Sequence, residues 1–194
     1  GATATVFRVI TTGGKICALK VFKKENSFED LCDEASLMLA SSYPQSHPNV
    51  LRADFVWYEQ RTGEMFFLLE LVDGGNLQGW MDDERLYAGT VEEVRMKLIT
   101  IVHQIACGLR HLHLIGILHQ DNKPENVLMT KQGRPLLADL GVATQGTVED
   151  AQVSATLRGG TPVYASPNVR RLFFQAKALP VTERADFLQQ HPIT

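Results

Sequence analysis

Two motifs decide the fold of this chain: His119-Gln120-Asp121-Asn122-Lys123-Pro124-Glu125-Asn126, and, at short range, Asp139-Leu140-Gly141. The first places a carboxylate, an ammonium group and a carboxamide within six residues, and the second adds another carboxylate beside a glycine. Between them, Val127-Leu128-Met129 and Leu136-Leu137-Ala138 are predicted strands, joined by a turn at Lys131-Gln132-Gly133-Arg134. A loop, a hairpin and a second loop therefore bring four polar side chains together, in a place that suits a divalent cation and phosphoryl transfer.

The two motifs resemble those of a eukaryotic protein kinase domain. The family's His-Arg-Asp-x-x-x-x-Asn stands here as HQDNKPEN, and its Asp-Phe-Gly as DLG. The resemblance implies that Asp121 accepts the proton of the substrate hydroxyl, that Lys123 supports the γ-phosphate, and that Asn126 and Asp139 hold Mg²⁺. A lysine two residues after Asp121 is the serine/threonine pattern rather than the tyrosine one. The alternative, a chance polar cluster in a loop, is opposed by six matched residues at two linked spacings.

The composition is that of a soluble globular protein. A length of 194 residues suits one domain, or one that is cut short, and 44% hydrophobic residues with a net charge of -3 argue against disorder. We expect no nucleic-acid surface, no membrane segment and no signal peptide, because basic runs, apolar runs of about 18 residues and a charged first region are missing. Cys17, Cys32 and Cys107 lack metal-ligand spacing, so we expect reduced, mostly buried cysteines in the cytoplasm or nucleus.

The first third of the chain predicts a hairpin followed by a helix. Strands are expected at 6–10 and 16–22, around the turn Thr12-Gly13-Gly14. Ser27 is the expected N-cap of a helix that runs towards Ser41. Its buried face is predicted to hold Leu31, Ala35, Met38 and Leu39.

Lys20 and Glu34 stand out within these elements. Each alone could be an ordinary solvated residue of a strand or a helix. A strand lysine followed by a helix glutamate, however, resembles the kinase ion pair. The resemblance implies that Lys20 contacts the α- and β-phosphates of ATP and that Glu34 orients it through a charge-assisted contact.

The resemblance also implies a nucleotide pocket. The stretch 1–6 is similar to the end of the glycine-rich loop, with Ala4 in place of a glycine, and small residues let backbone amides approach phosphates. Strands at 51–58 and 65–71 lead to a hinge, where backbone groups of two residues face the adenine; Leu69 guards the back of the pocket. The implied nucleotide contacts are Gly1, Val6, Ala18, Lys20, Glu34, Glu70, Val72, Asn76, Leu128 and Asp139.

A capping box at Thr90-Val91-Glu92-Glu93 begins a long helix that is expected to end near His113, before Gly116. Its apolar residues recur at helical spacing and are predicted to be core: Val94, Leu98, Ile101, Ile105, Leu109 and Leu112. The histidines at 103, 111 and 113 are interpreted as helix-surface or capping residues, since no cysteine or carboxylate completes a metal site. By resemblance, His119 is a core histidine that packs behind Leu140.

Several departures from the family pattern bear on regulation and completeness. Gln120 replaces the arginine that grips a phosphate on the activation loop, so control by such a phosphate lacks its receiver. Thr161 is expected to touch Asp121 and Lys123. The closing Ala-Pro-Glu stands as Ser166-Pro167-Asn168; Asp186 is expected to support the catalytic loop, and Pro192 to end any helix there.

The sequence therefore predicts an α+β, two-lobed kinase-like fold, incomplete at both ends. Residues 1–72 form a small antiparallel β-lobe and residues 73–194 a partial helical lobe. The predicted function is a serine/threonine kinase that uses ATP and Mg²⁺ and acts on a protein hydroxyl. Two alternatives stay open: a nucleotide-binding pseudokinase or regulatory module, favoured by Ala4, Gln120 and Asn168, and a truncated chain without a stable fold.

Overall fold

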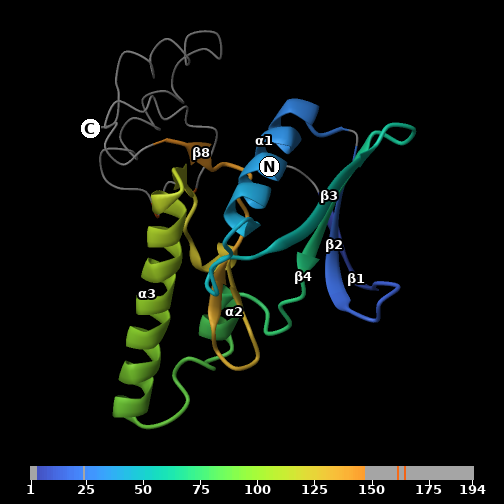
Figure 1. Ribbon diagram of the computed structural model, residues 1–194. Helices are drawn as coiled ribbons and strands as arrows, with labels where there is room; N and C mark the ends of the chain where they lie inside the picture. Colours follow the sequence, from blue (N-terminus) through green and yellow to red (C-terminus); the bar gives the residue numbers. More distant parts are fainter. Residues whose placement is uncertain (1–3, 24, 147–160, 162–163, 165–194) are drawn as a thin grey trace, which may run out of the picture.

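The structure is a computed structural model and describes residues 4–23, 25–146, 161 and 164. Figure 1 shows a β-sheet on one side and a long helix on the other, with a shorter helix seen between them. In chain order the elements are β1 (Ala4–Ile10), β2 (Ile16–Phe22), α1 (Phe28–Ser42), β3 (Ala53–Glu59), β4 (Glu64–Glu70), α2 (Leu77–Asp82), α3 (Val91–Leu114), β5 (Ile117–Leu118), the 3₁₀ turn η1 (Pro124–Asn126), β6 (Val127–Met129), β7 (Pro135–Leu137) and β8 (Thr144–Gln145).

The amino-terminal part is a four-stranded antiparallel sheet in the order β1-β2-β4-β3. The β1–β2 hairpin was predicted, and Gly14 in its turn has a φ of 80°, which glycine adopts without strain. The first strand starts at Ala4 rather than at residue 6, because Ala4 and Thr5 also pair with β2. Strand β3 starts at Ala53 rather than at residue 51, and β4 ends at Glu70 rather than at residue 71.

Helix α1 packs against this sheet. Its N-cap is Ser27, as predicted, and the Ser27 side chain accepts a hydrogen bond from the Asp30 N–H. The predicted burial of Leu39 is wrong: Leu39 is 37% exposed, and Leu37 is buried instead. At about 100° per residue, the buried arc of α1 is centred close to Glu34, and Leu39 falls just beyond its edge.

Helix α3 begins with the predicted capping box between Thr90 and Glu93. Its apolar stripe is only partly core, which corrects the prediction. Ile101 and Leu112 are buried, whereas Leu98 is exposed, as are other apolar residues of the helix: Val91, Met96, Ile99 and Val102. Among the described residues, the neighbours of α3 are chiefly β5 and β7.

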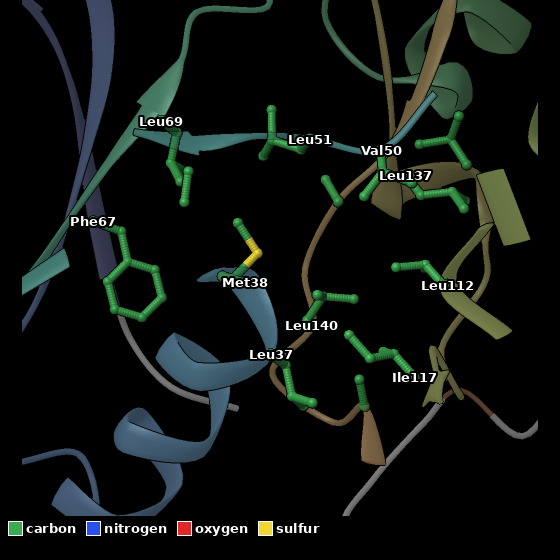
Figure 2. Close-up of a cluster of buried hydrophobic side chains, with 14 of the residues drawn as sticks. Leu37, Met38, Val50, Leu51, Phe67, Leu69, Leu112, Ile117, Leu137 and Leu140 are labelled. Atoms are coloured by element: carbon green, nitrogen blue, oxygen red, sulfur yellow. The ribbon is translucent and has the colours of Figure 1, made fainter. Parts of the chain in front are cut away.

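A continuous cluster of buried side chains joins the sheet to the helical part (Figure 2). The cluster draws on α1, β4, α3, the short strands and the DLG motif, and its labelled members are Leu37, Met38, Val50, Leu51, Phe67, Leu69, Leu112, Ile117, Leu137 and Leu140. Full burial of one such side chain contributes about 1.5–3 kcal/mol. The sheet and the two motif loops thus pack on one shared hydrophobic core. The prediction of an α+β fold is confirmed.

Two small antiparallel pairs frame the motif loops. β6 pairs with β7, as predicted, although β7 is shifted one residue towards the amino terminus. β5 pairs with β8, which the sequence did not predict, and neither did it predict α2 or η1. The expectations for residues 166–168, Asp186 and Pro192 lie outside the described residues. None of the helices in the described part of the chain has the length and apolar character needed to cross a bilayer.

Candidate active site

The loop between β5 and β6 gathers the three predicted catalytic side chains. Lys123 Nζ lies 2.7 Å from Asp121 Oδ2 and donates to Thr161 Oγ1 over 2.8 Å. Asn126 Nδ2 donates to both the backbone oxygen and Oδ2 of Asp121, each over 2.9 Å. The expected contact between Thr161 and Lys123 is therefore present, although these residues are 38 positions apart.

These contacts set the charge of the loop. Burial of Asp121 raises its pKa, but hydrogen bonds from Lys123, Thr161 and Asn126 together with the positive charge of Lys123 outweigh burial, so the pKa lies below its ordinary value. The same hydrogen bond to Asp121 holds the pKa of Lys123 above its ordinary value. Asp121 Oδ1 is buried and has no hydrogen-bond partner in the described part of the structure. The loop thus holds an ionised carboxylate, one oxygen of which is not bonded to any of the described residues.

A second charged group links β2, α1 and the DLG motif. Lys20 Nζ donates to Glu34 Oε1 over 2.9 Å and lies 3.8 Å from Asp139 Oδ1. Glu34 is only 5% exposed, and its burial raises the carboxyl pKa despite the opposing effect of Lys20. The predicted pair therefore exists, with its ammonium group facing a second carboxylate.

Asp139 occupies an unusual backbone position. Its φ is 67°, a value that few residues other than glycine, asparagine and aspartate adopt. A Cβ at Gly141 would lie 3.2 Å from both Asp139 Oδ1 and Glu34 Oε2. Gly141 therefore lets the chain pass close to both carboxylates, while the Asp139 side chain stays 53% exposed.

Asn126 and Asp139 are the residues that could hold a metal ion. Because Asn126 uses its Nδ2 on Asp121, its amide oxygen is the atom left for a ligand. The residues that the structure describes contain no group of three or more His, Cys, Asp or Glu side chains able to hold a metal. An oxygen pair of this kind fits Mg²⁺, which proteins hold through one or two side chains together with substrate phosphates.

The predicted nucleotide contacts come from the four-stranded sheet, from α1, from the stretch after β4, from β6 and from the DLG motif. Val6 is the cross-strand partner of Lys20, and Ala18 precedes Lys20 by two residues, so all three share one sheet face. Asn76 and Leu128 are joined by an isolated antiparallel β-bridge. Gly1 lies outside the described residues.

Two of these positions already have bonds that the sequence did not predict. The Glu70 N–H donates to the Arg52 carbonyl over 3.0 Å, so an adenine contact at Glu70 has to use the Glu70 carbonyl. Asn76 is the N-cap of α2, with its Oδ1 accepting from the Gly79 N–H over 2.8 Å. The sequence signal for this cap was an asparagine directly before an apolar turn.

His119 has a structural position. It is 2% exposed, and its Nε2 lies 3.1 Å from the Ala138 carbonyl, next to Asp139. Burial lowers its pKa, which keeps the ring neutral. The expectation of a core histidine is met in this geometry.

Sequence reasoning missed two side-chain pairs, one of them beside Asp121. Gln120 Nε2 donates to Thr144 Oγ1, and the rings of His47 and His111 are stacked with centroids 5.1 Å apart. Both pairs join residues that are far apart in the chain, and no spacing pattern marks them. His103 and His113 are exposed on α3, as expected.

Known proteins resemble the chain over most of its length. The family model described as protein kinase domain matches residues 1–186. The chain belongs to the protein kinase family. It is 27% identical to a serine/threonine-protein kinase PKH3 of Eremothecium gossypii over 179 residues, covering 87% of this chain and 23% of that protein.

Other relatives of this kinase-family chain carry similar names. A RAC family serine/threonine-protein kinase homolog of Dictyostelium discoideum is 29% identical, with 80% of this chain and 33% of that protein covered. Ribosomal protein S6 kinase 2 beta of Xenopus laevis is 32% identical, with 63% and 18% covered. The chain thus spans a third or less of the length of these relatives.

Proposed function

We propose that this chain is the catalytic part of a serine/threonine protein kinase that transfers the γ-phosphoryl group of ATP to a hydroxyl of a protein substrate. Residues 1–72 are its small lobe and residues 73–194 part of its helical lobe, with the hinge at Glu70–Val72. The observation that carries the proposal is the position of Lys20 Nζ between Glu34 Oε1 at 2.9 Å and Asp139 Oδ1 at 3.8 Å. A buried carboxylate that fixes an ammonium group beside an exposed carboxylate suits a phosphate-binding cation next to a metal ligand.

The nucleotide would lie between the sheet face of Val6 and Ala18 and the side chain of Leu128. Lys20 would bind the α- and β-phosphates, with Glu34 holding its ammonium group in one place. The Glu70 carbonyl and the backbone of Val72 would bind the adenine edge. Gly1 and Asn76 remain proposed contacts at the phosphates and the ribose.

Mg²⁺ would be held by the oxygen of Asn126 and the carboxylate of Asp139, and it would neutralise the charge that develops on the phosphates. Asp121 would accept the proton of the substrate hydroxyl. With its pKa below the ordinary value, Asp121 is ionised at neutral pH, as a proton acceptor must be. Lys123, held between Asp121 and Thr161, would stabilise the transferred group.

A second function rests on Gln120. A neutral amide cannot make the charge-assisted pair with a phosphate that an arginine makes. This favours a pseudokinase that binds nucleotide and acts through contacts. The intact set of Lys20, Glu34, Asp121 and Asp139 favours the enzyme.

The test uses the full-length protein with Mg²⁺ and ATP, and mass spectrometry of phosphoserine and phosphothreonine in a mixture of protein substrates. The proposal expects transfer that chelation of Mg²⁺ abolishes and that Asp139→Asn removes, with unchanged unfolding temperature because Asp139 is half exposed. Asp83→Asn, an exposed carboxylate at the end of α2, is the matched control. Nucleotide binding without transfer would support the pseudokinase, and wild-type transfer by Asp139→Asn would refute the metal assignment.

The cysteines and the net charge bear on the location and the partners of the protein. The three cysteines are free, as a reducing compartment requires, so we propose a cytoplasmic or nuclear protein. The net charge of -3 provides no overall attraction to nucleic acid, and the proposed partners are proteins with accessible serine or threonine hydroxyls.

A further inference from the structure

The turn that leads into Asp121 is strained at Gln120. The Asp121 N–H donates to the His119 carbonyl over 2.9 Å, and Gln120 between them has a φ of 60°. A hydrogen bond that joins residues i and i+2, with a positive φ at the residue between them, defines the rare, strained form of the γ-turn. A residue other than glycine keeps such a backbone only where its surroundings hold it there.

The side chain of Gln120 supplies one of these restraints. Its Nε2 donates to Thr144 Oγ1 over 2.6 Å in a partly buried position. Thr144 belongs to β8 and pairs with Leu118 of β5. Since Gly146 N also donates to the Gly116 carbonyl over 2.8 Å, the segment 144–146 is docked along 116–118.

A second restraint lies at Ala138, just before the DLG motif. His119 Nε2 contacts the Ala138 carbonyl at 3.1 Å, and the Ala138 N–H donates to the Asn126 carbonyl over 2.9 Å. The stretch 138–144, which includes Asp139, is therefore tied at both ends to the loop that carries Asp121.

We propose that Gln120 is a positioning residue. Its bond to Thr144 holds the strained turn and thereby fixes Asp121 relative to Asp139. Both partners are neutral, so the restraint needs no added phosphoryl group on the segment after DLG. The inference rests on the proposed kinase function and adds a determinant of its rate.

Four single variants and one double variant of the full-length protein test the inference. Gln120→Leu and Thr144→Val remove the donor and the acceptor with little change in size, and Thr144→Ser keeps the hydroxyl. Gln78→Leu is the matched control, because Gln78 Nε2 makes a similar 2.8 Å bond to Asp82 on the surface of α2. The expected result is a fall in kcat of about 10-fold for the first two variants, with the KM for ATP within about 2-fold.

Thr144→Ser and Gln78→Leu should keep the wild-type kcat, and the double variant Gln120→Leu/Thr144→Val should be no slower than the worse single variant. Hydrogen exchange at the amides of 143–146 gives a readout that does not need turnover, and it should be faster in both damaging variants. If the wild-type protein transfers no phosphoryl group, this result would count only against the proposed kinase function. The rates of hydrogen exchange at the amides of 143–146 would then decide the inference about Gln120.

The inference is overturned if Gln120→Leu and Thr144→Val both keep the wild-type kcat. A fall in their unfolding temperature alone would not rescue it. An equal loss in Thr144→Val and Thr144→Ser would also overturn it, as would unchanged exchange at 143–146.

Discussion

Lys20 Nζ donates to Glu34 Oε1 over 2.9 Å, and this bond connects the second strand of the sheet to the buried arc of helix α1. Only 5% of the Glu34 side chain is exposed, so the carboxylate depends on Lys20 for its compensation. The bond therefore fixes the ammonium group and at the same time ties the helix to the sheet.

Lys20→Met should reduce phosphoryl transfer by about 10²-fold or more, because the phosphates lose a fixed cation. It should also lower the free energy of unfolding by about 1–3 kcal/mol, because Glu34 is left buried without its partner. Glu34→Gln should reduce transfer less, and the double variant should show strong coupling in a double-mutant cycle of kcat and urea unfolding. Lys15→Met is the control, because Lys15 lies in the β1–β2 turn and pairs instead with Asp54 of β3. Additive effects would mean that Lys20 and Glu34 act independently.

Asp121→Asn should lower kcat by about 10²–10⁴-fold, the range of general acid–base assistance. Nucleotide affinity should barely change, because Asp121 faces the acceptor hydroxyl in the proposed site. Single-turnover kinetics and nucleotide titration separate the two quantities, with Asp82→Asn on α2 as the control. A large loss of affinity at an unchanged single-turnover rate would contradict the assigned role.

His111→Gln should raise the pKa of His47, measured by NMR titration of the imidazole signals. The pKa of His47 lies below its ordinary value because of burial and, next, the charge of His111, whose ring is stacked on it at an angle of 22°. A depressed histidine pKa contributes stability above an unfolded value of about 6.5, and this contribution is lost as the pH falls through the folded pKa. His111→Gln should therefore lessen that loss.

The control for this titration is His103→Gln, which changes an exposed histidine on the same helix. It should leave the pKa of His47 where it is. An unchanged His47 pKa in His111→Gln would show that burial alone causes the shift.

Gly108→Ala should destabilise the protein, although alanine usually stabilises a helix interior by about 1 kcal/mol. A Cβ at Gly108 would lie 2.7 Å from the Asn49 carbonyl and 3.0 Å from Leu137 Cδ1, and overpacking of this kind costs about 1–3 kcal/mol. Gly79→Ala on α2 is the matched control, since its nearest contact would be 3.4 Å from Asn76 Oδ1. The unfolding temperature should therefore fall in Gly108→Ala and rise in Gly79→Ala. A higher unfolding temperature in Gly108→Ala would disprove the close contact.

Local patterns were enough for the elements whose signals lie within a few residues. The capping box at Thr90 and the N-cap at Ser27 were predictable, because a cap is a contact between near neighbours. The strand pair around Gly14 was predictable for the same reason. Leu39 and Leu98 were placed wrongly, because periodicity shows that a helix has an apolar face but not how wide an arc its neighbours cover.

By itself, the sequence determined the family, the order of the longer strands and helices and the residue types of the site, because HQDNKPEN and DLG carry their chemistry at fixed short spacings. The tertiary structure alone decided that Lys20 faces Asp139 as well as Glu34, that His47 stacks on His111, and that Gln120 bonds to Thr144. Each of these contacts joins residues from separate elements. Their approach depends on how the shared hydrophobic core orients the sheet, α1 and α3, and no local pattern along the chain records that orientation.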